Sequence, residues 1–350
     1  MKSSPAKIVL ATGSAIVLVL LLLVVPWIFS SKALYPEWGR EGLEDCPGTR
    51  GPAWGPRCGN IEHLETYRYT EESFPSEDGS YATPAWHIPA AQPIDLGAHW
   101  RFSEALPETL AGWERAAARP VGFRLPPGQF AAIFVHGGGA DRREGYRFIA
   151  FFLRHGFDYY MPDLVCHGRA DCPERGLSFG VREHQDVLNL YRVLRARYRG
   201  LILAGTSVGS NSILVALPEM DDGVVALAVE NPMFSLTRFV EETPAAPAVF
   251  PTLYRDYLAW MVGLRGGFDR QRSPFQALSG LETGPPVFFM HSREDALIPW
   301  EHARDLSELY RGPHQLWILE QGGHARLWNA DPADYERRLE AFLKPLLPQS

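Results

Sequence analysis

The sequence predicts an α/β fold with a mostly parallel sheet, because three apolar runs each end in a loop that carries one polar residue. The runs and residues are 201–204 with Ser207, 286–291 with Asp295, and 315–319 with His324. Helix-like stretches at 211–217 and 301–310 separate the runs. Parallel strands joined by helices place their carboxyl ends at one edge of a sheet, where such folds bind their ligands. The three residues are therefore expected to meet there.

Ser207 lies at the centre of a G-x-S-x-G motif that runs from Gly205 to Gly209. A sharp strand-to-helix turn leaves no room for side chains at the glycines and exposes the serine hydroxyl in a strained conformation. The turn also directs the Val208 amide and the positive end of the following helix dipole at an oxygen bound beside the serine. The motif alone is a weak signal, because glycines also flank serines in ordinary loops.

The order Ser207, Asp295, His324 predicts a catalytic triad. A serine hydroxyl is a poor nucleophile, so an imidazole must take its proton, and a carboxylate must orient that imidazole. Glu294 competes with Asp295, but the shorter side chain beside Ala296 suits a fixed loop better. The alternatives are that Asp295 caps the following helix and that His324 is a glycine-flanked surface histidine.

A glycine run after the apolar stretch 131–135 predicts the second half of an oxyanion hole. The amide of Gly137 or Gly138 is expected to pair with that of Val208, since glycine lets the backbone approach a ligand closely. A phosphate site is the alternative for such a run. The sequence contains neither G-x-x-x-x-G-K-[ST] nor a dinucleotide-type G-x-G-x-x-G at this point, which argues against nucleotide binding.

With these residues in view, the chain resembles the α/β-hydrolase superfamily, in the branch of single-domain, often membrane-anchored serine hydrolases near the prolyl-oligopeptidase-type peptidases. The resemblance spans about residues 65–343. It is carried by Asp78-Gly79, His136-Gly137 with Arg142, Asp163 with His167-Gly168, Ser178-Phe179-Gly180 with Glu183 and Asp186, Ser207, Glu230-Asn231-Pro232, Asp295 with Pro299, and Gly323-His324. It implies an α/β-hydrolase fold with helices on both faces of the sheet and a small helical cap. Val165-Cys166 replaces the usual Arg-Gly, and Arg169-Ala170 follows where a small residue and serine are common.

The composition fits one large hydrolase domain at 65–350. The net charge of −7 argues against a nucleic-acid partner, which requires a clustered basic face. The eleven histidines show neither H-E-x-x-H nor close cysteine partners, so no metal is expected. No cofactor is expected either.

Residues 1–30 are expected to form a transmembrane anchor, because 8–29 is an uncharged apolar stretch of 22 residues. This length crosses a bilayer core of about 30 Å. The alternative is a signal peptide with cleavage near Ser31-Lys32-Ala33. Residues 31–64, rich in glycine, proline and charge, are expected to be a stalk.

The four cysteines form two close pairs, Cys46 with Cys58 and Cys166 with Cys172. Such pairs favour disulfides and hence an extracytoplasmic domain, in the periplasm, in a lumen or outside the cell. Four cysteines allow three pairings, of which the sequence-local one is preferred. Four free thiols are the alternative.

Two insertions are expected to set substrate choice. The insertion at 91–129 contains a helix that starts near Pro107, and the cap at 235–281 carries aromatic residues at the spacing of one or two amphipathic helices. Tyr254, Tyr257 and Trp260 are expected to line an apolar pocket for an acyl chain. The alternative is that these aromatics only seal the cap to the core.

The sequence therefore predicts a serine hydrolase that cleaves an ester or thioester of a small-molecule or lipid-like acyl substrate through an acyl-enzyme on Ser207. A peptidase acting on short peptides is the second hypothesis, since the same triad cleaves amides. A non-catalytic binding protein on a hydrolase fold is the third.

Overall fold

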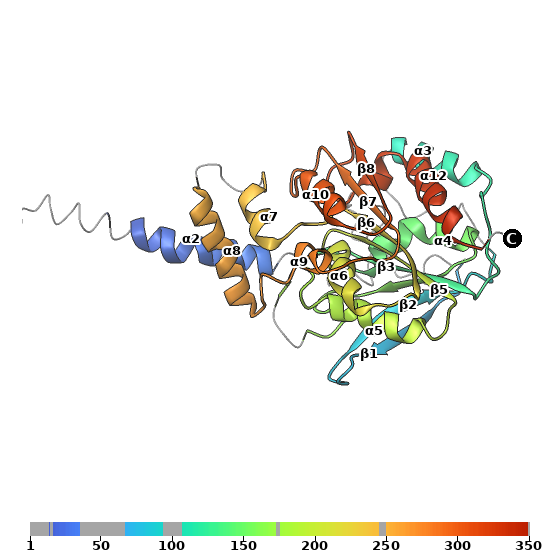
Figure 1. The fold of residues 1–350 in the computed structure, drawn as a ribbon, viewed down its shortest axis with the longest axis horizontal. Helices are drawn as coiled ribbons and strands as arrows, with labels where there is room; N and C mark the ends of the chain where they lie inside the picture. Colours follow the sequence, from blue (N-terminus) through green and yellow to red (C-terminus); the bar gives the residue numbers. More distant parts are fainter. Residues whose placement is uncertain are drawn as a thin grey trace, which may run out of the picture.

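The computed structural model of this chain describes residue 14 and residues 17–35, 67–93, 107–172, 176–244 and 250–348. A central sheet forms the middle of the molecule, and helices cover it on both sides (Figure 1). Helices α2, α7 and α8 lie together at one end, beyond the edge of this core (Figure 1). The predicted α/β-hydrolase fold class is confirmed.

The sheet has eight strands in the order β1-β2-β4-β3-β5-β6-β7-β8. Their bounds are β1 Thr70–Pro75, β2 Ala82–Ile88, β3 Phe130–Val135, β4 Asp158–Pro162, β5 Gly200–Thr206, β6 Val224–Glu230, β7 Val287–Ser292 and β8 His314–Leu319. Strand β2 pairs antiparallel with β1 and β4, whereas the strands from β4 to β8 in this order are parallel. Strands β5, β7 and β8 therefore end at the same edge, as the sequence predicts.

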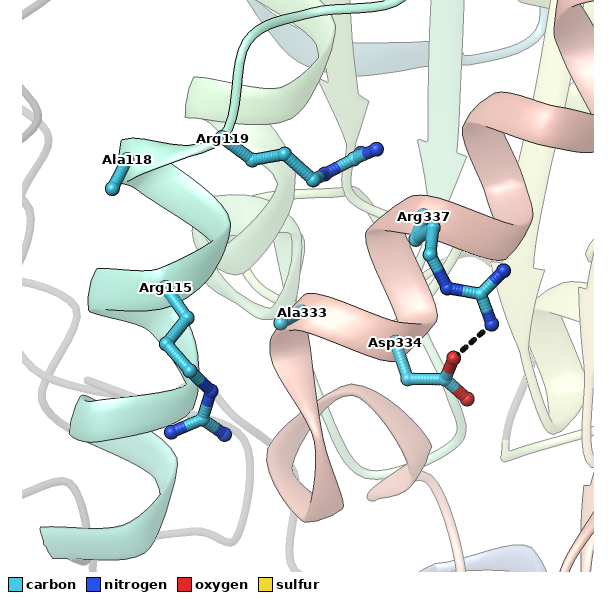
Figure 2. Close-up of a pocket in the computed structure, with 6 residues that line it drawn as sticks. All are labelled: Arg115, Ala118, Arg119, Ala333, Asp334 and Arg337. Carbon is cyan, nitrogen blue, oxygen red and sulfur yellow. Dashed lines mark hydrogen bonds and ion pairs between the residues drawn. The ribbon is translucent and has the colours of Figure 1, made fainter.

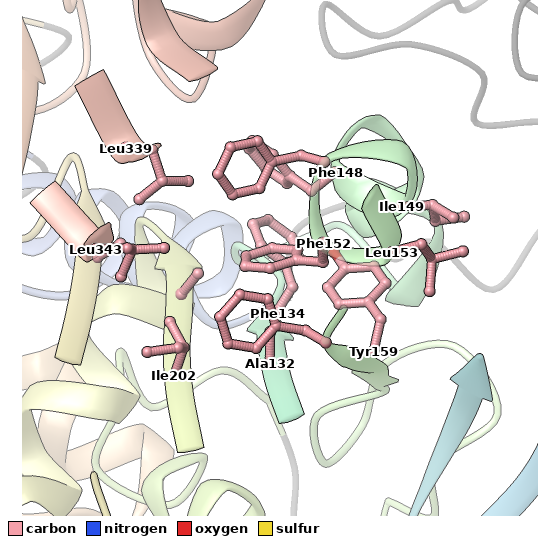
Figure 3. Close-up of a cluster of buried hydrophobic side chains, with 14 of the residues drawn as sticks. Ala132, Phe134, Phe148, Ile149, Phe152, Leu153, Tyr159, Ile202, Leu339 and Leu343 are labelled. Atoms are coloured by element: carbon pink, nitrogen blue, oxygen red, sulfur yellow. The ribbon is translucent and has the colours of Figure 1, made fainter. Parts of the chain in front are cut away.

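Alternate side chains of each central strand enter two separate cores, since successive residues of a strand point to opposite faces. On β3, Ala132 and Phe134 join a cluster that contains α4 and α12 side chains (Figure 3). Ala131, Ile133 and Val135 join the cluster on the opposite face, with side chains from α5, α6 and α10. Burial on both faces explains why these strands are continuous apolar runs rather than alternating ones.

The helices of the described residues precede, connect or follow the strands along the chain. Their bounds are α2 Val25–Leu34, α3 Pro107–Ala118, α4 Ile149–Arg154, α5 His184–Leu194, α6 Val208–Ala216, α7 Leu236–Glu242, α8 Thr252–Gly266, α9 Pro274–Ser279, α10 Glu301–Leu309, α11 Leu327–Ala330 and α12 Pro332–Leu343. Short 3₁₀ helices occupy Arg142–Phe148, Leu217–Glu219 and Lys344–Leu346. The helix expected near Pro107 is α3. Strand β1 was not predicted, because its sequence is mostly polar and it pairs only at the edge of the sheet.

The cap region contains three helices, α7, α8 and α9, rather than the one or two that its aromatic spacing predicts. Side chains of α7 and α8 share a small core of their own. Leu34 from the end of α2 is fully buried in the same core. Helix α2 thus continues beyond residue 30, into the segment expected to be a stalk; the rest of that stalk, including Cys46 and Cys58, lies outside the described residues.

Among the described residues, one helical stretch, 17–34, is long and apolar enough to cross a membrane. It includes a π-helical segment at Leu20–Val24. A signal sequence near the N-terminus satisfies the same criteria.

Candidate active site

Ser207 occupies the turn between β5 and α6 with a φ of 51°, in the left-handed region that non-glycine residues rarely adopt. Its amide donates to the Glu230 carbonyl at 2.8 Å, which fixes the turn against β6. A Cβ at Gly209 would lie 2.0 Å from the carbonyl oxygen of Val135, so only glycine lets α6 pack this closely on β3. The turn leaves the Ser207 side chain half-buried at the end of the strand.

The structure brings Ser207, Asp295 and His324 together, although they lie in three different loops. The His324 ring has its Nε2 3.1 Å from the Ser207 Oγ and its Nδ1 2.8 Å from the Asp295 Oδ2. Asp295 lies in the loop after β7, and His324 lies in the loop after β8. A Ser–His–Asp catalytic triad requires this order of contacts, with the imidazole between the hydroxyl and the carboxylate. Glu294, the competing acid, is exposed.

Asp295 is held by four further contacts that the sequence analysis did not anticipate. Its Oδ1 accepts from the amides of Leu297 and Ile298 at 2.8 and 2.9 Å. Its Oδ2 accepts from the Asn231 amide group at 2.8 Å and lies 3.1 Å from the His291 Nε2. Burial opposes ionisation, but the charge of His324 and the hydrogen bonds from the two histidines hold the pKa of Asp295 well below its usual value.

Asn231 and His291 are the site residues that sequence reasoning left without a role. Asn231 follows β6 with a φ of 49°, and its side-chain oxygen also accepts from the Ala325 amide at 3.0 Å. It thus connects Asp295 to the loop that carries His324. The sequence signal that could have identified Asn231 is the motif Glu230-Asn231-Pro232, which is part of the family resemblance and follows a buried strand.

The environment of His324 favours its protonated form. Burial lowers the pKa of the imidazole, but the Asp295 charge and hydrogen bond outweigh it, and Glu144 and Glu230 add to the effect. The net result is a pKa above the ordinary value for histidine. The side chain remains 23% exposed, so it is in contact with solvent.

The Gly137 amide does not fit its expected role in an oxyanion hole, because it already donates to the Glu144 carboxylate at 2.7 Å. The Gly139 amide donates to the His167 Nε2 at 3.3 Å. Within the described part of the chain, the amides of Gly138 and Val208 have no hydrogen-bond acceptor. Gly138 is exposed beside Val208, since a Cβ on it would lie 3.0 Å from the Val208 side chain.

Glu144 lies beneath the site and connects three of its loops. Its carboxylate accepts from Gly137 and, at 2.6 Å, from the Thr206 hydroxyl that precedes the serine. It pairs with Arg147 at 3.3 Å, and Arg147 donates at 2.9 Å to the carbonyl of Ala325, next to His324. Both charged side chains are 1% exposed. A buried charge is tolerated only when paired and hydrogen-bonded, so this pair fixes the loops relative to one another.

Of the three residues expected to line an apolar pocket, Tyr254 and Tyr257 contact the N-terminal helix and Trp260 lines a surface hollow of about 410 Å³ on the cap. All three lie on α8, and the hydroxyls of Tyr254 and Tyr257 donate to carbonyls of the N-terminal helical stretch. Trp260 is 44% exposed on the surface of the cap. Tyr254 and Tyr257 reach the N-terminal helix through their hydroxyls, which find backbone acceptors there.

A surface hollow of about 530 Å³ lies elsewhere, between α3 and α12 (Figure 2). Its three arginines, Arg115, Arg119 and Arg337, each pair with a carboxylate, so the hollow holds no uncompensated positive charge of theirs. Across the described ranges, no cluster of three histidine, cysteine, aspartate or glutamate side chains has the arrangement of a metal site.

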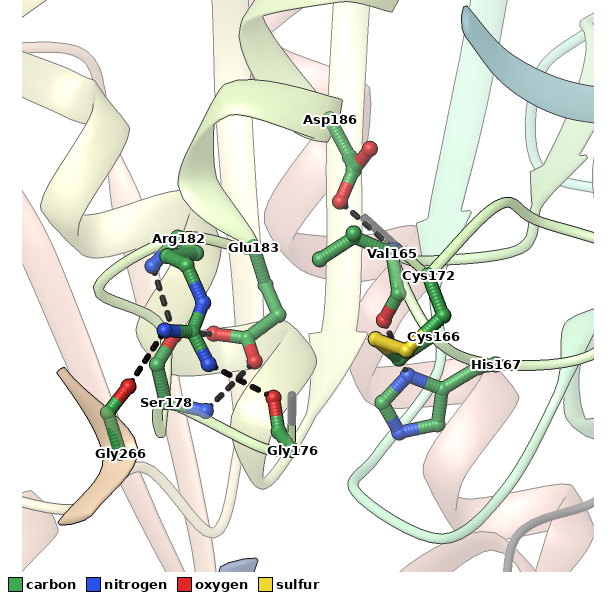
Figure 4. Close-up of a disulfide and its surroundings, with 10 residues drawn as sticks. All are labelled: Val165, Cys166, His167, Cys172, Gly176, Ser178, Arg182, Glu183, Asp186 and Gly266. Carbon is green, nitrogen blue, oxygen red and sulfur yellow. Dashed lines mark hydrogen bonds between the residues drawn. A yellow bond between two sulfur atoms is a disulfide. The ribbon is translucent and has the colours of Figure 1, made fainter. Parts of the chain in front are cut away.

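The predicted Cys166–Cys172 disulfide is present and closes the loop that carries His167 (Figure 4). Cys166 has a φ of 65°, at the position where the resemblance would place glycine. Burial lowers the pKa of His167 to about 4, with a further contribution from His136. The neutral ring donates from Nδ1 to the Val165 carbonyl at 2.9 Å, which leaves Nε2 to accept from the glycine loop.

The fold and this cluster of side chains define an α/β hydrolase. Residues 132–338 match the model of the alpha/beta hydrolase family. This match covers more than half of the chain, so the chain belongs to that family, as its motifs predict.

Two bacterial proteins are similar to this chain over about three fifths of its length. The YqkD protein of Bacillus subtilis is 27% identical over 60% of this chain and 70% of its own length. The YfhR protein of Escherichia coli K12 is 21% identical over 62% of this chain and 72% of its own.

Solved structures share the fold at low sequence identity. An esterase of Pyrococcus furiosus, Pf2001, has a TM-score of 0.57 at 16% identity, with 88% of this chain and 98% of that chain covered. An acylaminoacyl peptidase of Pyrococcus horikoshii has a TM-score of 0.52 at 15% identity, with 83% of this chain and 43% of that chain covered.

Proposed function

We propose that this chain is a serine hydrolase that cleaves a carboxylic ester or thioester through an acyl-enzyme on Ser207. The observation that carries the proposal is the His324 ring, whose two nitrogens lie 3.1 Å from the Ser207 Oγ and 2.8 Å from the Asp295 Oδ2. In a family of hydrolases, this is the contact order that nucleophilic catalysis by serine requires.

In the proposed reaction, the Ser207 Oγ attacks the carbonyl carbon while the His324 Nε2 takes the hydroxyl proton. The amides of Val208 and Gly138 would stabilise the negative oxygen, worth about 3 kcal/mol for each such donor. His324 then gives its proton to the departing alcohol or thiol as the C–O or C–S bond breaks. Water then attacks the acyl-enzyme carbonyl while His324 takes one of its protons. His324 returns this proton to the Ser207 Oγ as the acyl C–O bond breaks, which releases the acid and restores the hydroxyl.

A substrate panel tests this function. The full-length protein is assayed with aryl esters of graded acyl length, an acyl thioester and aminoacyl amides, beside its Ser207→Ala variant. Turnover of esters or the thioester by the wild type alone is expected. Turnover of amides in preference to esters would favour a peptidase, which is the second candidate because the acylaminoacyl peptidase shares the fold. No turnover of any compound would contradict the proposal and favour a binding protein.

We also propose that the N-terminal apolar helix is a retained anchor and that the hydrolase domain lies outside the cytosol. The disulfide supports this location, because such bonds persist in oxidising compartments. Protease treatment of intact cells or spheroplasts is expected to degrade the domain. Protection of the domain until the membrane is lysed would contradict this topology.

A further inference from the structure

We propose that the cap helix α8 lies on the lipid bilayer beside the N-terminal helix, so that the enzyme draws a membrane-partitioned ester from lipid rather than from water. The proposal rests on the proposed function in one respect, the membrane location of the N-terminal helix. It adds a second membrane-contacting element and a substrate class.

The outer face of α8 is apolar and exposed. Leu253, Trp260 and Leu264 are 83%, 44% and 59% exposed, and their spacing places them on one side of the helix. The opposite side carries Leu258 and Val262, which are buried in the cap core. The cap is therefore complete without the outer face. Several large apolar side chains exposed on one side of a helix favour a contact with a partner or a membrane.

Contacts with the N-terminal helix identify the partner as lipid. Helix α8 crosses that helix (Figure 1), and its Tyr257 hydroxyl donates to the Leu22 carbonyl at 2.8 Å. Further along α8, Arg265 donates to the Trp27 carbonyl at 2.7 Å. Leu22 lies within the apolar stretch 8–29, so a bilayer that surrounds this stretch also reaches the outer face of α8.

The depth of insertion follows from the same contacts. Leu22 and Trp27 are five positions apart, which is about 7 Å along a helix. If the N-terminal helix runs across the bilayer, Tyr257 therefore lies about 7 Å deeper than Arg265, a difference that an interfacial helix can span. Arg265 also lies 3.5 Å from the Trp27 ring centroid. A tryptophan and an arginine at this level are typical of the membrane–water interface.

The same helices adjoin the loops around Ser207. The Leu34 carbonyl, at the end of α2, accepts from the Leu177 amide at 2.8 Å. The Leu177 side chain in turn lies against Gly138, where a Cβ would be 3.0 Å away. Arg182 donates at 2.7 Å to the Gly266 carbonyl at the end of α8 (Figure 4). A bilayer on α8 would therefore lie near the loops around Ser207, which favours a substrate dissolved in lipid.

Photocrosslinking of the full-length protein in phosphatidylcholine vesicles tests the contact directly. A p-benzoylphenylalanine replaces Leu253 or Leu264, with Leu20 on the N-terminal helix as positive control and Leu316 on β8, 38% exposed, as negative control. Lipid adducts are expected at the first three positions and not at Leu316. This readout requires no enzymatic activity, so it stands apart from the hydrolase proposal.

Three results would overturn the inference. Adducts at Leu20 but not at Leu253 and Leu264 would show that the anchor is in lipid and α8 is not. Crosslinks from α8 to a second copy of the chain in place of lipid would identify a protein interface. No adduct at Leu20 would remove the anchor on which the inference rests.

Activity provides the test of substrate class. Leu253→Glu and Leu264→Glu are expected to reduce hydrolysis of a long-chain ester in vesicles about tenfold each, because a charge replaces a lipid-contacting leucine. Hydrolysis of a short soluble aryl ester should stay unchanged, as should both activities in the control Leu316→Glu. An unchanged ratio of the two activities in the α8 variants would contradict the lipid source. If the wild type did not hydrolyse the soluble ester at all, the result would instead count against the hydrolase proposal.

Discussion

The loops around Ser207 and the α2–α8 end of the molecule both depart from the usual rule that charged side chains are exposed and apolar ones buried. They depart from it in different ways. Around Ser207, carboxylates are buried: Asp295 is 5% and Glu144 1% exposed, and both are hydrogen-bonded. At the other end, Leu253 is 83% and Trp27 60% exposed. Buried charge costs stability and is retained where chemistry requires it, whereas exposed apolar surface is retained where a nonpolar partner covers it. One region thus indicates a reaction and the other a location.

The strongest way to break this comparison is to remove the buried charge from Asp295. Asp295→Asn is expected to lower kcat about 10⁴-fold, because asparagine neither stabilises the imidazolium nor holds the required tautomer of His324. The measurement is the rate of ester hydrolysis with thermal unfolding as a check on the fold. The exposed neighbour provides the control, and Glu294→Gln should change kcat little. Equal losses in the two variants would contradict the assignment.

A second substitution tests whether the buried pair under the site carries stability. Glu144→Gln leaves Arg147 buried without its charged partner, so the free energy of unfolding should fall by about 3 kcal/mol. Urea denaturation measures this change. The matched substitution at the cap is Asp256→Asn, which removes the partner of Arg270 from a partly exposed pair. Its expected cost is below about 1 kcal/mol. Similar losses in the free energy of unfolding at both positions would show that the buried pair contributes no more stability than the partly exposed one.

The Cys166–Cys172 disulfide allows the stabilisation by the cross-link to be measured apart from the backbone strain at Cys166. Cys172→Ser opens the short loop and should lower the free energy of unfolding by about 2 kcal/mol. The double variant Cys166→Gly/Cys172→Ser should recover up to about 1 kcal/mol, because glycine adopts the left-handed conformation of Cys166 without strain. Urea denaturation of both variants measures the difference. A double variant less stable than the single one would show that the left-handed backbone at Cys166 does not strain the folded protein.

The smallest expected effect is on the pH profile. In the proposed mechanism His324 must be neutral to accept the serine proton, and its pKa lies above the ordinary value for histidine. Activity should therefore fall as pH drops through a midpoint above about 6.5, the reference value for histidine. In Asp295→Asn the remaining activity should decline at lower pH, since the charge that raises the pKa is gone. A kcat/KM profile that stays flat from neutral pH to about pH 5 would contradict this role of His324.

Local patterns made much of the fold and the meeting of three side chains predictable. The G-x-S-x-G turn and the strand-end positions of Asp295 and His324 depend on short-range geometry, which a sequence displays directly. The parallel strands were visible as apolar runs for the same reason. Strand β1 was missed because its polar residues pair only at an edge.

Contacts that depend on tertiary packing could not be predicted in the same way. Gly137 has the sequence context of an oxyanion donor, yet its amide bonds to Glu144, seven residues further on, whose carboxylate no motif marks. Tyr254 and Tyr257 have the spacing of a pocket lining, but their acceptors lie more than 200 positions earlier in the chain. Such partners are chosen by tertiary packing, which periodicity does not encode.

Covalent labelling tests the central claim most directly. The intact protein is treated with a fluorophosphonate, digested and examined by mass spectrometry, with Ser207→Ala as the matched variant. One adduct is expected on the peptide that contains Ser207, with no labelling of the variant and an unchanged circular dichroism spectrum. Labelling of Ser207→Ala to the same extent as the wild type, or an adduct on another serine, would contradict that claim.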